Sequence, residues 1–180
     1  MENTTLSKLN ISSHRYWTLV TASFSHVSIL NLAVNMLNLA IFAPALYKAG
    51  GVGIGAAHII GLTVGTAVFT NVMFLTYKWN RPSNPSYAED DIRAHWHGSG
   101  ASGVAMAFAT AATCLAPQAR IAVGRFTVPI RTWWLTAFLV FGDLTAIGDD
   151  DNIGHEVHLS GAAFGLAYHM VVLRKPYGWW

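Results

Sequence analysis

Long stretches without a charged side chain dominate this sequence and restrict what it can fold into. Four of them contain no Asp, Glu, Lys or Arg: residues 16–47, 50–77, 94–119 and 157–173. A helix that crosses a bilayer needs about 20 mostly apolar residues. A fifth stretch, 132–148, is interrupted by Asp143 and predicts a weaker span. We therefore predict an all-α fold, a polytopic membrane bundle with about five transmembrane helices.

The overall composition supports lipid as the solvent for most of the surface. Hydrophobic residues make up 53% of the 180 residues and charged residues only 11%, whereas a soluble domain carries roughly 25% charge. The formal net charge of +2 is too small to indicate a nucleic-acid partner. We expect membrane lipid to cover the chain, and no nucleic acid to bind it.

Five spans would place the connecting segments alternately on two sides of the membrane. One side would receive only basic charges, from Lys48, Arg120, Arg125, Arg131, Arg174 and Lys175, while all nine acidic residues would fall on the other. The positive-inside rule then predicts that the C-terminus faces the cytoplasm or its topological equivalent. We divide the chain into a short polar segment (1–15), a transmembrane domain (16–174) and a C-terminal tail (175–180).

Polar side chains inside apolar spans cost free energy unless they find partners, so they mark candidate sites. Asn31 and Asn35 are four residues apart and share one helix face. Such a face fits interhelical hydrogen bonding as well as it fits a functional site. Ser102 lies between Gly100 and Gly103 at the start of an apolar stretch, where neighbouring groups can approach its hydroxyl.

Histidines raise the question of a metal. His155 and His158 are three residues apart around a glutamate, whereas the zinc metalloprotease pattern requires four. His95 and His97 have no companion ligands at metal-binding spacing. We therefore expect no metal and no cofactor. A histidine at the polar end of an apolar helix can instead act as a general base, as His158 could.

Two pairs of glycines at a spacing of four predict close helix packing. They are Gly61 with Gly65, and Gly161 with Gly165. Small residues at this spacing allow two membrane helices to approach closely. Helix packing alone is sufficient to explain both pairs of glycines in the sequence.

Taken in order, these residues resemble a known family. His26, Asn31 and Asn35 precede Gly100-Ala101-Ser102-Gly103, and His158-Leu159-Ser160-Gly161 follows, with Gly165 four residues later. The order resembles the rhomboid family of intramembrane serine proteases over about residues 15–173. The segments 100–106 and 155–158 are most similar to the mitochondrial inner-membrane branch, which implies an integral multi-pass protein of that membrane.

The resemblance implies a serine-type endopeptidase that cleaves transmembrane-anchored protein substrates. Ser102 would be the nucleophile and His158 the general base of a dyad that requires no acidic third member. Asn35 and Asn31 would stabilise the oxyanion together with the Ser102 backbone N–H. The residues expected to shape the site are His26, Gly100, Gly103, Gly161 and Gly165.

The sequence departs from the family pattern in two places. Asn31 stands where the family has a second histidine, although an asparagine amide can also donate a hydrogen bond. The family's first core helix has no counterpart before His26, so we expect a truncated or divergent five-helix form. Two rival functions therefore stay open: an inactive rhomboid-like protein that binds membrane clients, and a small transporter subunit with a path lined by His58, Asn71 and the asparagines.

Overall fold

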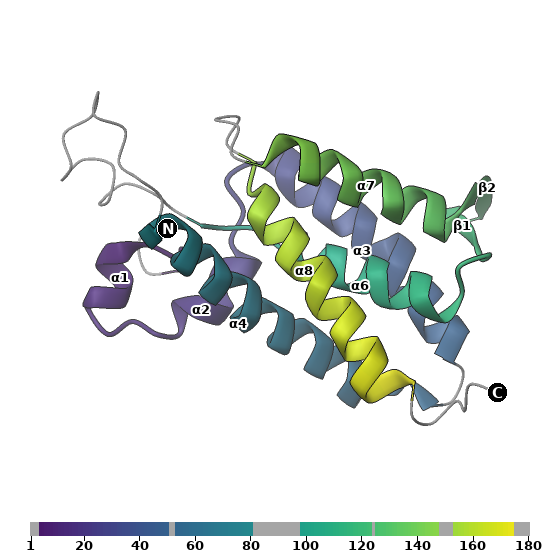
Figure 1. Ribbon diagram of the computed structural model, residues 1–180, viewed down its shortest axis with the longest axis horizontal. Helices are drawn as coiled ribbons and strands as arrows, with labels where there is room; N and C mark the ends of the chain where they lie inside the picture. The colour runs from purple at the N-terminus through teal and green to yellow at the C-terminus, as the bar shows by residue number, and fades with distance from the viewer. Residues whose placement is uncertain (1–3, 51–52, 81–97, 124, 148–152, 175–180) are drawn as a thin grey trace.

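The computed structural model describes residues 4–50, 53–80, 98–123, 125–147 and 153–174, and it is mostly helical (Figure 1). Each of the five predicted apolar stretches overlaps one of its longer helices, although three of these helices extend by two or three residues beyond their stretch. In chain order the elements are α1 (Lys8–Ser12), α2 (Thr18–Thr21), the 3-10 helix η1 (Ala22–Phe24), α3 (Ile29–Gly50), α4 (Ala56–Asn80), α6 (Ser102–Leu115), β1 (Arg120–Val123), β2 (Phe126–Arg131), α7 (Thr132–Ala146), α8 (His155–Tyr168) and the π-helix η3 (His169–Leu173).

Helix α6 forms the centre of the bundle. It contacts α8 most extensively, followed by α3, and also packs against α4 and α7. Figure 1 shows α7 and α4 on opposite sides of α8, with α6 behind it. Most of α6 is buried, including Ala105, Ala107 and Ala111. Small side chains let the surrounding helices approach α6 closely.

Only α3 and α4, among the described residues, are long and apolar enough to cross a membrane by length and composition. Helix α6 is apolar but has 14 residues, and α7 and α8 have 15 and 14. These lengths fall short of the roughly 20 residues that a perpendicular span needs. The count of five spans therefore stays a prediction.

A small antiparallel hairpin, β1–β2, lies between α6 and α7, and the all-α prediction omitted it. Arg120 pairs with Arg131, and Val123 pairs with Phe126. The segment 120–131 is rich in β-branched and aromatic residues, which favour strands. The segment also carries Arg120, Arg125 and Arg131, whose charges predict only a connection between two spans and give no sign of strand pairing.

The N-terminal segment, residues 4–24, packs against the residues that lead into α6. Leu6 is fully buried and exchanges backbone hydrogen bonds of 2.9 and 2.8 Å with Gly98. The Asn71 side chain of α4 donates to the Leu19 carbonyl at 2.8 Å and to the Ser23 hydroxyl at 3.2 Å. The bonds of Leu6 therefore hold residues 4–24 beside the segment that leads into Ser102, and those of Asn71 hold them against α4. The predicted domain boundary at residue 15 stays a prediction.

The two ends of the bundle differ in the segments they gather. The N-terminal segment, the end of α4 and the starts of α6 and α8 meet at one end, where Lys78 and Glu156 lie 3.5 Å apart. The hairpin with its arginines lies at the other end (Figure 1). The candidate site lies at the first end.

Candidate active site

Ser102 is the first residue of α6 and is partly buried. The N-cap residue Ala101 provides no side-chain cap, and the first backbone hydrogen bond of the helix runs from the Ala105 N–H to the Ala101 carbonyl at 2.8 Å. The N–H groups of the first turn have no partner within a helix. The Ser102 backbone N–H is therefore available to a ligand beside its own hydroxyl.

Gly100 turns the chain into α6. Its φ of +119° lies in a region that residues with a side chain rarely adopt. The Gly100 N–H donates to the Ala22 carbonyl at 3.0 Å, and the Ala101 N–H donates to His26 Nε2 at 3.4 Å. The N-terminal segment and His26 thus fix the turn immediately before Ser102.

Asn31 and Asn35 lie beside this turn. A Cβ at Gly100 would be 3.4 Å from Asn31 Oδ1 and 3.8 Å from Asn35 Nδ2. Asn35 is buried, and its Nδ2 donates to Asn31 Oδ1 at 3.4 Å. The two amides therefore lie against the backbone two residues before Ser102.

The crossing of α6 and α8 is a backbone contact. A Cβ at Gly161 would overlap the Gly103 carbonyl oxygen and lie 2.9 Å from Gly103 Cα. His158 is three residues before Gly161, so both lie on one side of α8. Ser102, next to Gly103, and His158 are thereby at the same end of the crossing.

The dyad contact itself is not formed. Within the part of the chain that the structure describes, no hydrogen bond joins the Ser102 hydroxyl to His158. Catalytic hydrogen bonds are often long before substrate binds, so this geometry does not exclude the pair. The assignment of Ser102 and His158 as a dyad stays a prediction.

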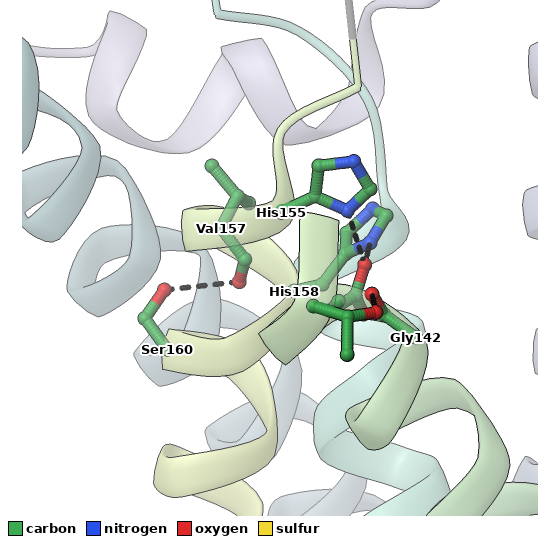
Figure 2. Close-up of polar contacts among 7 residues, drawn as sticks. Gly142, His155, Val157, His158 and Ser160 are labelled. Carbon is green, nitrogen blue, oxygen red and sulfur yellow. Dashed lines mark hydrogen bonds and ion pairs between the residues drawn. The ribbon is translucent and has the colours of Figure 1, made fainter. Parts of the chain in front are cut away.

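An acidic residue that the predicted site did not include holds His158. Asp143, buried in α7, has its Oδ1 at 2.9 Å from His158 Nδ1 and at 2.7 Å from His155 Nδ1. Figure 2 shows the His155 and His158 rings close together at the start of α8, with Ser160 on the other side of that helix. Ser160 donates to the Val157 carbonyl at 2.9 Å.

Asp143, His155 and His158 could also hold a metal ion, because their ligand atoms lie within 4.8 Å of one another. Their closest separations, 2.7 and 2.9 Å, are hydrogen-bond lengths. Ligands on a tetrahedral zinc with bonds of about 2.0–2.1 Å would be about 3.3 Å apart. The cluster therefore fits hydrogen bonding better than metal coordination. His95 and His97 lie outside the described residues.

The polar residues of the transporter hypothesis have separate roles. Asn71 holds the N-terminal segment, and His58 Nδ1 lies 3.1 Å from the Tyr168 hydroxyl.

Asp143 is the residue that sequence reasoning missed. Its signal was an acidic group inside an apolar stretch, which in membrane helices marks a candidate functional residue.

The family model of the Rhomboid domain matches residues 13–175. The chain belongs to the rhomboid family. This membership confirms the resemblance and makes the protein a helical membrane protein of the rhomboid type. The rhomboid is similar to RHOMBOID-like protein 12, mitochondrial, of Arabidopsis thaliana, with 28% identity over 169 residues. That match covers 91% of this chain and 48% of the relative, so the chain spans about half the relative's length.

Proposed function

We propose that this rhomboid is an intramembrane serine endopeptidase that cleaves transmembrane-anchored proteins. The observation that carries the proposal is the backbone crossing at Gly103 and Gly161, because Ser102 and His158 are at the same end of it. The turn at Gly100 adds two amide side chains beside this end. Together these residues supply a nucleophile, a base and hydrogen-bond donors, which acyl transfer requires.

In the proposed reaction, His158 Nε2 takes the proton of Ser102 as Oγ attacks the scissile carbonyl. The tetrahedral intermediate collapses when His158 returns that proton to the leaving amine. Water then attacks the acyl-enzyme, with His158 again acting as base, and releases the second product. No cofactor or metal takes part.

The developing oxyanion needs donors already in place. The Ser102 N–H is one such donor. Asn35 Nδ2 carries two hydrogens and gives one to Asn31, so the other remains for the oxyanion. Asn31 also has an amide donor at the position where the family pattern has a histidine.

The short α6 also suits chemistry inside a membrane. At about 1.5 Å per residue, its 14 residues extend about 21 Å, which is less than the hydrocarbon thickness of about 30 Å. We propose that five helices cross the membrane and that α6 begins below its surface, at a cavity that water enters from the loops. The substrate would be cut near the mouth of its transmembrane helix. The relative's name is mitochondrial, and residues 100–106 and 155–158 resemble the mitochondrial inner-membrane branch of the family. On these two grounds we propose the mitochondrial inner membrane as the location.

The nucleophile can be tested with a fluorophosphonate probe, which reacts with activated serines. We expect the wild-type protein to be labelled and to cleave a transmembrane substrate, and Ser102→Ala to lose both properties while keeping its fold. Ser99→Ala is the matched control, because Ser99 lies in the same segment. Retained labelling in Ser102→Ala, or its loss in Ser99→Ala, would contradict the assignment.

The oxyanion donor can be tested with Asn35→Ala. Removing one such donor typically costs about 10²–10³ in rate. We therefore expect a large fall in kcat with little change in KM, measured on detergent-solubilised protein with unchanged thermal unfolding. The alternative result is less folded protein with an unchanged rate per folded molecule. That result would indicate that Asn35 stabilises the fold through its hydrogen bond and does not act on the oxyanion.

A client-binding protein without catalytic activity is the second candidate, favoured by the absent hydrogen bond between Ser102 and His158. Such a protein would bind a membrane client but neither react with the probe nor cleave. The labelling experiment therefore separates the two functions.

A further inference from the structure

Asp143 is an acidic side chain in a helix that is otherwise almost entirely apolar. It is only 7% exposed and lies within α7, between Gly142 and Leu144. A buried carboxylate is costly unless it is paired or hydrogen-bonded. The partners of this carboxylate therefore indicate why the chain tolerates it.

The hydrogen bonds of Asp143 determine where each histidine carries its proton. An ionised carboxylate can only accept hydrogen bonds. His155 and His158 both approach Asp143 Oδ1 through Nδ1, so each ring carries a proton on Nδ1. In a neutral His158 ring, Nε2 is then unprotonated and able to accept a proton. That is the form that a general base for Ser102 requires.

We propose that Asp143 is a positioning residue that holds His158 in its Nδ1–H tautomer and orients the ring, with Nε2 toward Ser102. The catalytic meaning of this inference rests on the proposed function. When His158 takes the serine proton, the negative carboxylate also stabilises the imidazolium that forms. Asp143, His158 and Ser102 would then act in the order of an acid, base and nucleophile triad.

His155 supports the same arrangement from the first position of α8. Its Nδ1 donates to the oxygen that accepts from His158, and the two rings meet edge to face with centroids 6.1 Å apart. Two donors on one oxygen fix the carboxylate between α7 and α8. His155 is thus a second donor that keeps Asp143 in place for His158.

A purely structural role for Asp143 would leave the His158 tautomer and the split between kcat and KM unaffected. Asp143→Asn keeps the side-chain size but removes the negative charge, and its amide can donate to His158 Nδ1. In a serine protease triad the same change leaves the geometry intact and lowers kcat about 10⁴-fold through the wrong tautomer. Here we expect a fall in kcat of at least about 10²-fold, with little change in KM.

Two further variants sharpen the kinetic test. Asp143→Glu restores a carboxylate and is expected to recover part of the lost kcat. Glu156→Gln is the matched control, since Glu156 is an acidic residue on α8 that pairs with Lys78 and not with His158. We expect its kcat to stay at the wild-type value. A kcat of Asp143→Asn equal to the wild-type value would overturn the inference, while the Ser102 experiment would still decide the proposed function.

The tautomer can be observed without any activity. ¹⁵N NMR of the full chain with labelled histidine distinguishes Nδ1–H from Nε2–H rings, and the spectrum of His158→Ala identifies the His158 signals. We expect an Nδ1–H ring in the wild-type protein and an increased Nε2–H population in Asp143→Asn. An Nε2–H ring in the wild-type protein would overturn the inference, even if Asp143→Asn did not fold.

The labelling and NMR experiments can also detect a metal ion bound by Asp143, His155 and His158. Zinc on His158 Nδ1 would remove the hydrogen bond to Asp143. We expect a chelator to leave both the labelling by fluorophosphonate and the His158 signals unchanged. Loss of labelling on chelation, with recovery on added zinc, would show that the cluster is a metal site and would overturn the positioning role.

Discussion

Two helix contacts of α8 use glycines at the same spacing of four but in different ways. Where α8 meets α6, Gly161 and Gly165 face backbone: Cβ atoms there would overlap the carbonyl oxygens of Gly103 and Ala107. Where α8 meets α4, Gly61 and Gly65 face side chains. A Cβ at Gly65 would lie 2.7 Å from Phe164 Cζ, and one at Gly61 would lie 3.3 Å from the Tyr168 hydroxyl.

The difference concerns how much each contact can adapt. A backbone carbonyl cannot move without moving its helix, whereas the end of an aromatic ring can shift by rotating its side chain. The α6–α8 contact therefore sets the distance between the helices that carry Ser102 and His158. The α4–α8 contact holds the bundle together but does not determine that distance.

Gly161→Ala is expected to have the largest effect. The added methyl group would push α8 away from Gly103, next to Ser102. Overpacking of this kind costs about 1–3 kcal/mol of unfolding free energy, and a displacement of about 1 Å at a catalytic site can cost about 10²-fold in rate. Thermal unfolding in detergent and substrate cleavage measure the two effects.

Gly142→Ala is the control for this prediction, because it adds the same methyl group inside a helix where nothing lies within 4 Å of the new Cβ. We expect no loss of stability for this variant. If Gly161→Ala kept both its stability and its cleavage rate, the α6–α8 backbone contact would not set the geometry of the site.

Gly65→Ala is expected to have a much smaller effect. The Phe164 ring must move, but replacing a helical glycine with alanine also gains about 1 kcal/mol of helix propensity. We expect the unfolding free energy to change by less than about 1 kcal/mol, with cleavage near the wild-type rate. Gly61→Ala, with its looser contact, should lose neither stability nor cleavage activity. A loss of activity in Gly65→Ala as large as that in Gly161→Ala would remove the distinction between the two contacts.

Much of the helical architecture can be predicted from the distribution of charge. The free-energy cost of placing charges in lipid leaves long apolar stretches, and each of the five overlaps one of the longer helices. The hairpin 120–131 could not be predicted in this way, because strand pairing joins residues through turn geometry and not through the helical period. The count of spans also stays open, since α6, α7 and α8 are short.

For the candidate site, too, the sequence predicts some features and only the structure shows the others. The spacing of Asn31 and Asn35 places both on one helix face, and the glycines around Ser102 indicate an accessible hydroxyl. Neither pattern reveals that these amides lie beside Gly100. That contact depends on how α3 is rotated relative to the start of α6, and the N-terminal segment helps to fix this start through hydrogen bonds from Gly98 and Gly100.

The sequence by itself determined which segments are apolar enough for lipid and which polar residues need partners within them. Only the tertiary structure determined which residues are the partners of these polar side chains. Asp143 interrupts an apolar stretch in the sequence, and His158 lies near the start of another, 15 residues later. Their hydrogen bond exists because α7 and α8 pack with the two side chains facing each other. Helix periodicity sets the face of one helix on which a residue lies, but packing among several helices sets the direction of that face.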